Sequence, residues 1–475
     1  MTNVRTRFAP SPTGFLHIGS VRAALYPWLL AKHYGGQFIL RIEDTDQARE
    51  VEGALNVIYE TLDWVGIDWD EGPDKGGPYG PYKQTERKEH YLKWAQDLIA
   101  KGRAYADPRS ADDLDKIRAD AKARKRPFLA RDYRPDNNVD WQPGMPLRFL
   151  SQPKAYHWHD EVMGDLSAGI DAVDDFILLK SDGLPTYNFA HIVDDADMAI
   201  THVIRGLEYI ASMPKYLNLY EALEIKTPVF VHMPHIMRPD GAKKLGKRDG
   251  AKSVLEYRDE GYLPEAMINF LALLGWNPGT TQEIFSTQEL IEKFSLERIQ
   301  RSGARFDERR LIWMNGNYIR NLTSEELYIK AQTFWPEEAA TYDEAYKKRV
   351  LELVKDRLKY FSELADLTRF FFIDLPINSE LIANNKKLSE LGGDELKSLL
   401  HETIGVLKTS DFSLADLTQK LNDLLEHTNQ TPTVLFSLIR IASTQAPASP
   451  PLAESLSVIG KDRTINRLNQ QADAL

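Results

Sequence analysis

The sequence predicts an α/β fold with a parallel sheet, an inserted domain and a following all-helical region. The first eighty residues alternate between strand-like and helical stretches, an order for which a parallel sheet is the usual outcome. Residues 101–157 hold thirteen Lys and Arg against eight Asp and Glu, which indicates an insertion with its own composition. Beyond about residue 325 the apolar residues follow helical spacing almost throughout.

The composition excludes several classes of protein. The chain has 475 residues, enough for about three domains at roughly 100–200 residues each, and its 43% hydrophobic residues argue against wholesale disorder. It has no cysteine, which excludes disulfides, thiolate metal sites and cysteine nucleophiles. No apolar run is long enough for a membrane span, and the first residues lack the apolar stretch of a signal peptide, so we expect neither. The net charge of −11 means that any nucleic-acid binding must rest on local basic patches.

The elements of the first part follow from turn residues and hydrophobic spacing. We expect Ser20 to cap a helix that Pro27 kinks and that Gly35-Gly36 ends. Strand-like runs at residues 4–9 and 37–42 flank this helix, and a second helix is expected at residues 54–64. Strand and helix texture returns later, with β-rich runs at residues 176–179, 201–204 and 229–232.

The last part reads as helices joined by loops. Pro239-Asp240-Gly241 opens a loop that carries several basic residues. Beyond residue 325 we expect amphipathic helical runs at 349–361 and 414–425, and a loop at 446–451.

Residues 10–20 have the pattern of a phosphate site. A turn of small residues leads directly into a helix, whose first N–H groups and positive dipole end attract phosphate. Gly19 allows a ligand to approach the backbone closely, and His17 adds a side-chain donor for a phosphoryl oxygen. Taken alone, a histidine two residues before a glycine is a weak signal, because most histidines are structural.

A second candidate is the basic loop at residues 243–248. Lys244 and Lys247, three positions apart beside Gly246, are suited to holding a triphosphate as mobile point charges. The alternative is a solvated basic loop, which is the commoner meaning of such a run.

A third group of residues suits a small acidic substrate with an amino group. Arg7 and Arg205 stand at strand ends, where an α/β sheet binds its ligands, and guanidinium groups bind carboxylates through two hydrogen bonds. Glu43 stands at another strand end and suits an ammonium group, and Tyr187 offers a hydroxyl. The alternatives are surface salt bridges for the charged residues and a core position for the tyrosine.

These segments, in this order, resemble the class I aminoacyl-tRNA synthetases, and their sequence motifs resemble those of the bacterial-type glutamyl-tRNA synthetase family. The most specific matches are RFAPSPTGFLHIG at residues 7–19 and RIEDTD at 41–46. Further matches run along nearly the whole chain: DEGP at 70–73, GPYKQTER at 80–87, SDGLPTY at 181–187, VDD at 193–195, THVIRG at 201–206, KLGKR at 244–248, LGW at 274–276, FDERRLIWMNGNYIR at 306–320 and GKDR at 460–463.

The resemblance implies a Rossmann-like catalytic domain in two halves, an insertion that binds the tRNA acceptor end, a stem-contact domain with the lysine loop, and a helical anticodon-binding region. The implied bounds are 1–80 and 186–240 for the two halves, 81–185 for the insertion, 241–325 for the stem-contact domain and 326–475 for the helical region. It also implies a monomeric cytoplasmic ligase of protein biosynthesis, with no membrane partner.

The resemblance implies that the enzyme joins L-glutamate to the 3′ end of tRNA(Glu) through a glutamyl-adenylate, using ATP and Mg²⁺. By position, the glutamate-binding residues are Arg7, Ala9, Ser11, Glu43, Tyr187 and Arg205. The ATP-binding residues are His17, Gly19, Glu208, Ile236, Lys244 and Lys247, of which His17, Lys244 and Lys247 are catalytic. Arg440 is placed as an anticodon-reading residue, and no residue is placed as a metal ligand.

The chain departs from the family pattern at several positions. Gly246 replaces the usual serine of the lysine loop, Leu207 replaces a usual acidic residue, and His191 and Tyr209 stand where other residues are expected near glutamate. The insertion lacks the cysteines that bind zinc in some members, so we expect it to fold without zinc.

Four other functions remain open at this level. A glutaminyl-tRNA synthetase differs in the first signature and has a β-barrel C-terminal half. A shortened enzyme that transfers glutamate to a tRNA base lacks an anticodon domain. A small-cofactor adenylyltransferase shares His17 and Gly19 but not RIEDTD, and a tRNA-binding module without activity fits if Gly246 marks a degenerate site.

Overall fold

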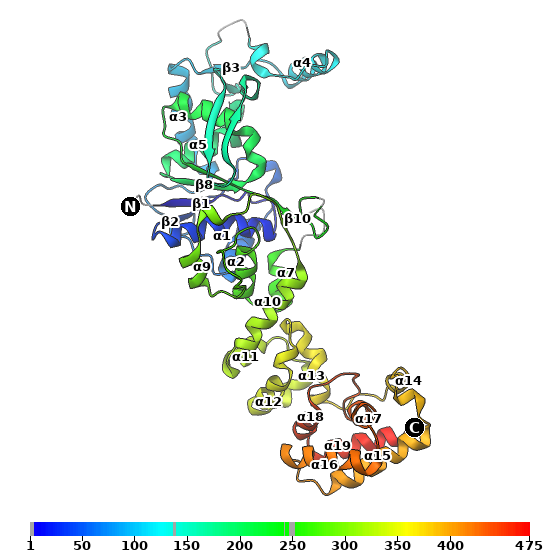
Figure 1. Cartoon of the computed structure of the whole chain (residues 1–475). Helices are drawn as coiled ribbons and strands as arrows, with labels where there is room; N and C mark the ends of the chain where they lie inside the picture. The colour runs from blue at the N-terminus through cyan, green and yellow to red at the C-terminus, as the bar shows by residue number, and fades with distance from the viewer. Residues whose placement is uncertain (1–3, 136–138, 242, 247–251) are drawn as a thin grey trace. The chain divides into compact units, whose positions relative to one another are not determined.

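The computed structural model describes residues 4–135, 139–241, 243–246 and 252–475 (Figure 1). The chain divides into two compact units, residues 1–258 with 264–308 and residues 259–263 with 309–475. The first unit combines strands and helices, whereas the described elements of the second are all helical. The predicted α/β part and all-helical region are therefore confirmed.

Four parallel strands form the base of the first unit. β1 (Arg5–Phe8) pairs with β2 (Gln37–Leu40), and β8 (His202–Gly206) pairs with β9 (Val229–Met233). The backbone N–H of Thr201 donates to the carbonyl of Arg5 over 2.9 Å, which sets β8 beside β1. The predicted runs thus form parallel strands, and their carboxyl ends share one edge, where ligands bind in open α/β sheets.

The helix α1 (Ile18–His33) packs against β1 and β8. It begins earlier than expected, because His17 and not Ser20 is its N-cap: the His17 backbone is extended, and its ring accepts hydrogen bonds from the N–H groups of Gly19 and Ser20. An imidazole with an unprotonated nitrogen satisfies the free N–H groups that a serine hydroxyl was expected to meet. The helix continues through Pro27, whose carbonyl accepts from the hydroxyl of Thr6.

Residues 88–179 add a second, antiparallel layer. β3 (Ala104–Ala106), β4 (Leu147–Phe149) and β7 (Ile177–Leu179) form a sheet in that order, and β5 (Tyr156–Asp160) forms a hairpin with β6 (Gly164–Ala168). The β-rich run at 176–179 is therefore an antiparallel strand of this layer. Its pairing with β4, over a gap of some thirty residues, leaves no local trace in the sequence.

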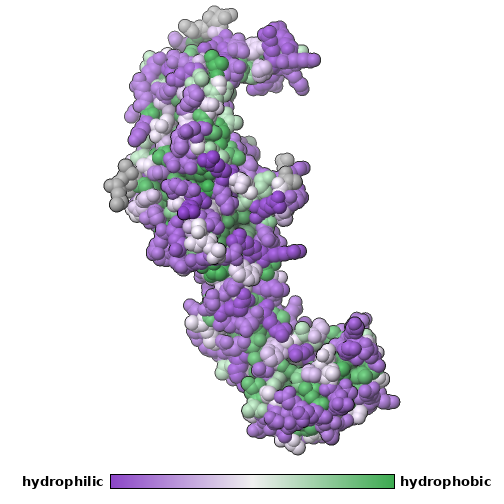
Figure 2. Space-filling view, viewed as in Figure 1, coloured by the Kyte–Doolittle hydropathy of each residue, from purple (hydrophilic) through white to green (hydrophobic). Residues whose placement is uncertain are grey.

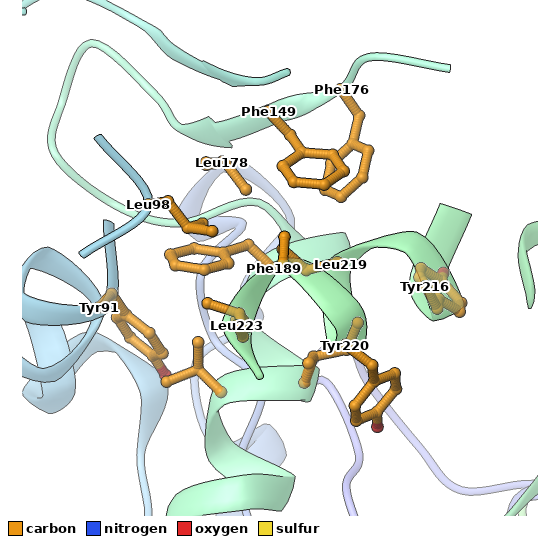
Figure 3. Close-up of a cluster of buried hydrophobic side chains, with 14 of the residues drawn as sticks. Tyr91, Leu98, Phe149, Phe176, Leu178, Phe189, Tyr216, Leu219, Tyr220 and Leu223 are labelled. Carbon is orange, nitrogen blue, oxygen red and sulfur yellow. The ribbon is translucent and has the colours of Figure 1, made fainter. Parts of the chain in front are cut away.

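A single hydrophobic cluster joins this layer to the helices behind the parallel strands. Figure 3 shows the rings of Phe149 and Phe176 beside each other, with Phe189 and Leu219 nearby. The Phe149 and Phe176 ring centroids are 5.3 Å apart. The helices that carry the cluster are α3 (Lys88–Ala100), α5 (Tyr187–Asp197) and α6 (Met213–Leu223).

The first unit has further α-helices and short strands. They are α2 (Ala54–Trp64), α4 (Ala111–Ala123), β10 (Ile236–Met237), α7 (Val254–Asp259), α8 (Pro264–Ala272), α9 (Thr287–Lys293), and β11 (Ala304–Arg305), which pairs with β10. The visible face of α4 is covered by hydrophilic residues (Figure 2). The helix α10 (Glu308–Asn321) begins at the end of this unit.

The second unit is built from helices around its own core. These are α11 (Ser324–Ala331), α12 (Glu344–Val354), α13 (Leu364–Phe372), α14 (Glu380–Ala383), α15 (Gly393–Lys408), α16 (Leu414–Thr428), α17 (Pro432–Thr444), α18 (Leu452–Ile459) and α19 (Lys461–Asp473). The run expected at 349–361 is not one helix, since α12 ends at Val354 and a 3₁₀ turn follows. The buried guanidinium of Arg467 donates to the carbonyls of Phe370, Ile373 and Ser443, which ties α13 to α17 and α19.

None of the helices within the described ranges has both the length and the apolar character needed to cross a membrane. The inner domain bounds at residues 80, 185, 240 and 325 stay predictions.

Candidate active site

A cavity of about 410 Å³ opens at the carboxyl ends of β1 and β8, in front of the first turn of α1. Its wall includes every residue predicted for the glutamate and ATP sites that the structure describes, namely Arg7, Ala9, Ser11, His17, Gly19, Glu43, Tyr187, Arg205, Glu208, Ile236 and Lys244. Lys247 lies outside the described residues. The fold therefore brings the separated motifs together, while the ligand that each residue binds stays a prediction.

His17 is held in one orientation by the start of α1. Its Nδ1 accepts from the N–H of Gly19 at 3.0 Å and of Ser20 at 3.2 Å, so the neutral ring carries its proton on Nε2. Gly19 is required beside it, because a Cβ there would lie 2.8 Å from Cε1 of His17. His17 can therefore donate from Nε2 to an anion at the positive end of the helix.

Arg7 is neutralised within the protein. Its Nε and Nη2 donate to the two carboxylate oxygens of Asp195 over 3.0 and 3.3 Å. The same carboxylate accepts from Arg41, whose Nη2 donates to Glu43 over 3.0 Å. Burial opposes ionisation of Asp195, but Arg7 and Arg41 outweigh it and hold the pKa of this carboxyl well below its usual range.

Glu43 stands at the cavity end of this chain of charges. Burial raises the pKa of Glu43, and Arg41 and Arg7 offset part of that rise. A carboxylate that is costly to keep charged in a buried wall favours the arrival of a cation, which suits an ammonium group.

Arg205 is held differently from Arg7. Its Nε donates to Nε2 of His232 over 3.2 Å, its Nη1 lies 3.3 Å from Nε2 of His191, and its Nη2 contacts the sulfur of Met213. Its guanidinium also lies 5.0 Å from the ring centre of Tyr209. Within the described part of the chain no carboxylate pairs with Arg205, so its buried positive charge remains available to the cavity.

Aromatic rings form the wall beside Arg205. The rings of Tyr187 and His191 are stacked with their centroids 4.7 Å apart, and Tyr209 lies 5.5 Å from Tyr187. Burial raises the pKa of both tyrosines, so their hydroxyls keep their protons. Burial, and then the charge of Arg205, lowers the pKa of His191 to about 3, so this ring is neutral.

Lys244 and Glu208 also line the cavity, where they form an ion pair. Lys244 Nζ lies 2.9 Å from Oε1 of Glu208, and His235 lies 3.6 Å from the other oxygen. Burial opposes ionisation of Glu208, yet the hydrogen bond from Lys244 lowers its pKa overall. The lysine loop is anchored to β10, since the N–H of Leu245 donates to the carbonyl of Ile236 over 2.8 Å, and Gly246 follows on the cavity wall.

The predicted RNA-binding parts contain basic side chains that pair with carboxylates and others that do not. In residues 101–157 many basic side chains are paired, for example Arg109 and Arg148 with Asp107, whereas Lys122, Lys125 and Arg126 pair with none of the carboxylates that the structure describes. In the second unit, Nη1 of Arg440 donates to the carbonyls of Ser449 and Pro450 and to the Ser449 hydroxyl. Its role toward tRNA stays a prediction.

Sequence reasoning missed the residues behind the cavity wall. Asp195 lies in the VDD motif and Arg41 in RIEDTD, but neither motif indicates their ion pair, and no pattern in the sequence singles out Asp160 or His232. The pair of aspartates at the end of α5 was the available signal, because adjacent buried acids need cationic partners.

Comparisons with known proteins agree with this geometry. Residues 3–313 match the family described as "tRNA synthetases class I (E and Q), catalytic domain", and residues 326–472 match "Anticodon binding domain". The glutamate–tRNA ligase of Dehalococcoides mccartyi is 41% identical over 477 residues, covering 98% of this chain and 97% of that protein. That of Clostridium botulinum is 43% identical over 485 residues, covering 100% of this chain and 99% of the relative.

Solved structures extend the likeness to the whole fold. The crystal structure of a glutamate–tRNA ligase from Elizabethkingia meningosepticum, in complex with its amino acid, superposes with a TM-score of 0.90 at 33% identity, covering 100% of both chains. The enzyme from Elizabethkingia anophelis gives 0.88 at the same identity, covering 99% of this chain and 100% of the other. The chain belongs to the glutamyl-tRNA synthetase family of the class I aminoacyl-tRNA synthetases.

Proposed function

We propose that the chain joins L-glutamate to the 3′ end of tRNA(Glu) with ATP, through a glutamyl-adenylate, for protein synthesis. Arg205 carries the choice of amino acid: a buried guanidinium with no described carboxylate partner faces the cavity. A side-chain carboxylate pairs with it through charge-assisted hydrogen bonds, whereas the neutral amide of glutamine would lose the charge and direct N–H groups at a cation.

In the first step an oxygen of the glutamate α-carboxylate bonds to the α-phosphorus of ATP, and the bond to the β-phosphate breaks to release pyrophosphate. The carboxylate is already ionised near neutral pH, so no base is needed, and catalysis consists of positioning and charge stabilisation. His17 donates from Nε2 to the phosphate oxygens at the helix N-terminus. Lys244 leaves Glu208 to pair with the phosphates.

In the second step a hydroxyl of the terminal ribose attacks the carbonyl carbon of the adenylate. The proton of the hydroxyl passes to a phosphate oxygen of the departing AMP as the carbon–oxygen bond to AMP breaks, and glutamyl-tRNA is formed. The cations Lys122, Lys125 and Arg126 of the insertion suit the phosphates of the acceptor end, and the helical second unit suits the anticodon, where Arg440 is the predicted reader.

ATP in such enzymes is used with Mg²⁺, and the acidic side chain of Glu208 on the cavity wall fits this ion. Within the described ranges no group of three or more His, Asp or Glu side chains forms a cage for a metal. Mg²⁺ binds proteins through one or two carboxylates together with substrate phosphates, and Glu208 is the acidic side chain beside Lys244. When bound, the ion neutralises phosphate charge; we propose Glu208 as its protein-side ligand.

Several alternatives lose support. The described elements of the second unit are helices, whereas a glutaminyl-tRNA synthetase would carry a β-barrel there, and the shortened tRNA-modifying enzyme would lack this unit. An adenylyltransferase of small cofactors needs neither unit two nor the insertion. We also propose that the enzyme is a cytoplasmic monomer, as the family resemblance implies.

Aminoacylation of purified tRNA(Glu) and tRNA(Gln), with radiolabelled glutamate or glutamine, tests the proposal. We expect ATP-dependent charging of tRNA(Glu) with glutamate and no charging with glutamine. Charging with glutamine, or adenylate formation without transfer to any tRNA, would reject it. The same assay shows whether tRNA(Gln) is charged with glutamate as well.

A further inference from the structure

A chain of three buried side chains runs behind the amino-acid end of the cavity. Asp160 ends β5, His232 lies on β9 and Arg205 lies on β8. Oδ2 of Asp160 lies 2.6 Å from Nδ1 of His232, and Nε2 of the same ring accepts from Nε of Arg205 over 3.2 Å. Asp160 and His232 are fully buried, and Arg205 is 6% exposed. These three side chains connect the β5–β6 hairpin to the guanidinium of Arg205, which faces the cavity.

The hydrogen-bond partners of His232 determine which of its ring nitrogens carries the proton. The Nε of arginine always carries a proton, so Nε2 of His232 must act as the acceptor. The neutral ring then holds its proton on Nδ1 and donates it to Asp160. Asp160 also accepts from the N–H groups of Met163 and His232, over 2.8 and 3.1 Å to its two oxygens. A carboxylate with this many donors stays ionised and keeps the tautomer of His232 fixed.

His191 supplies a second neutral acceptor. Its Nδ1 lies 2.7 Å from the carbonyl of Tyr187, so Nδ1 donates there and Nε2 accepts from Nη1 of Arg205. The sulfur of Met213 takes one N–H of Nη2. Of the five N–H groups of a guanidinium, these contacts use one on each nitrogen. One N–H on Nη1 and one on Nη2 remain, a pair that matches the two oxygens of a carboxylate.

We propose that Asp160 and His232 are positioning residues for Arg205: Asp160 holds the His232 tautomer that accepts from Nε, so that Arg205 presents its two remaining donors to the side-chain carboxylate of glutamate. This inference rests on the proposed function. A carboxylate in the place of His232 would also hold Arg205, but it would neutralise the charge that the substrate must meet. The neutral imidazole of His232 holds Arg205 in place through its hydrogen bond, and it separates the negative charge of Asp160 from the guanidinium.

The fold explains why the hairpin is part of this arrangement. The N–H of Glu161 donates to the carbonyl of Phe230 on β9 over 3.0 Å, which sets the β5–β6 turn against the strand that carries His232. The backbone of His232 also donates to Asp160, so the carboxylate fixes the strand and the ring together.

Steady-state aminoacylation by the full chain tests the inference through His232→Phe, which keeps a ring but removes the acceptor. We expect the KM for glutamate to rise at least tenfold while the KM for ATP stays within twofold. His232→Gln, whose amide can accept from Arg205 and donate to Asp160, should return the KM for glutamate to within threefold of wild type. His159→Phe is the matched control, because His159 lies on β5 next to Asp160 but is exposed and paired with Asp165; it should leave both KM values unchanged.

An unchanged KM for glutamate in His232→Phe, an equal rise for glutamate and ATP, or no recovery in His232→Gln would overturn the inference. A wild-type chain that charges no tRNA with glutamate would instead reject the proposed function. If His232→Phe does not fold, ¹⁵N-histidine NMR of the wild-type chain decides, with the His232 signals assigned by their absence from His232→Gln. A proton on Nδ1 supports the inference, and a proton on Nε2 overturns it.

Discussion

Arg7 is bound to Asp195 by two hydrogen bonds of 3.0 and 3.3 Å, so its charge is balanced before any substrate arrives. Arg205, on the neighbouring strand β8, contacts neutral groups instead. The two arginines therefore have different tasks: Arg7 belongs to a buried ion network, and Arg205 is the cation available to the substrate. Their replacement should separate stability from substrate binding.

We predict that Arg205→Ala raises the KM for glutamate at least about thirtyfold, with a much smaller change for ATP, because losing one partner of a buried charge pair costs about 2–5 kcal/mol. Steady-state aminoacylation measures both constants. Arg205→Lys should recover little, since lysine cannot offer two parallel donors. Equal effects on both substrates would contradict the assignment.

Arg7→Ala should act mainly on stability. It leaves Asp195 buried with Arg41 as its remaining close cation, and breaking a buried pair costs about 3–5 kcal/mol. Chemical denaturation of this variant and of Arg205→Ala gives the comparison. Comparable loss of stability in the two variants would show that Arg7 has no special place in the ion network.

His17→Ala should slow adenylate formation by about 10²–10³-fold, the scale of one lost oxyanion donor. Gly19→Ala should also slow it, since the added Cβ would press on the His17 ring at 2.8 Å. His33, exposed at the end of the same helix, provides the control variant His33→Ala. ATP–pyrophosphate exchange with tRNA present measures the rate, and near-normal exchange in His17→Ala would refute its role.

Lys244→Ala should lower the rate of adenylate formation about 10²-fold and leave the KM for glutamate unchanged, because Lys244 pairs with Glu208, whereas Arg205 contacts His232, His191 and Met213. The adjacent Lys243 is exposed and is not part of the cavity wall, so Lys243→Ala is the control. We expect Lys247→Ala to match Lys244→Ala, from the sequence pattern alone. A loss shared equally by Lys243→Ala would point to a general charge effect.

Gly246→Ser tests the departure in the lysine loop. A serine there restores a hydroxyl and a stiffer backbone at the cavity wall, so we predict a lower KM for ATP, by up to about tenfold, roughly the value of one net hydrogen bond. Exchange kinetics at varied ATP give the answer. An unchanged or higher KM would show that the loop of this chain is adapted to glycine.

Stability should fall in mild acid because of His191, whose pKa burial and Arg205 lower to about 3. An unfolded histidine takes a proton near pH 6.5, while the native ring stays neutral, so the unfolded state gains protons as the pH falls. By the linkage relation, this difference in protonation lowers the free energy of unfolding by about 2 kcal/mol between pH 7 and pH 5. Hydrogen exchange of α5 amides should show this loss in wild type and a smaller one in His191→Asn; equal losses would contradict the neutral buried ring.

Local sequence signals were enough to predict most helices and strands. They could not predict the buried residue pairs behind the cavity, because the partners lie far apart in the sequence. The runs at 37–42 and 54–64 became β2 and α2 within two residues, because turn residues and hydrophobic spacing act locally. Ser20 was the wrong cap, since a nearby histidine met the same N–H groups. Arg7 and Asp195 are 188 positions apart, and Asp160 and His232 are 72 apart, distances over which one sequence carries no pairing signal.

A crystal structure of the chain with a non-hydrolysable glutamyl-adenylate analogue tests the central claim most directly. We predict the side-chain carboxylate of the analogue within hydrogen-bonding distance of both Nη atoms of Arg205, the ammonium group beside Glu43, and the phosphate mimic beside His17. A carboxylate bound instead to Arg7, with Arg205 left without contact to the analogue, would contradict the account.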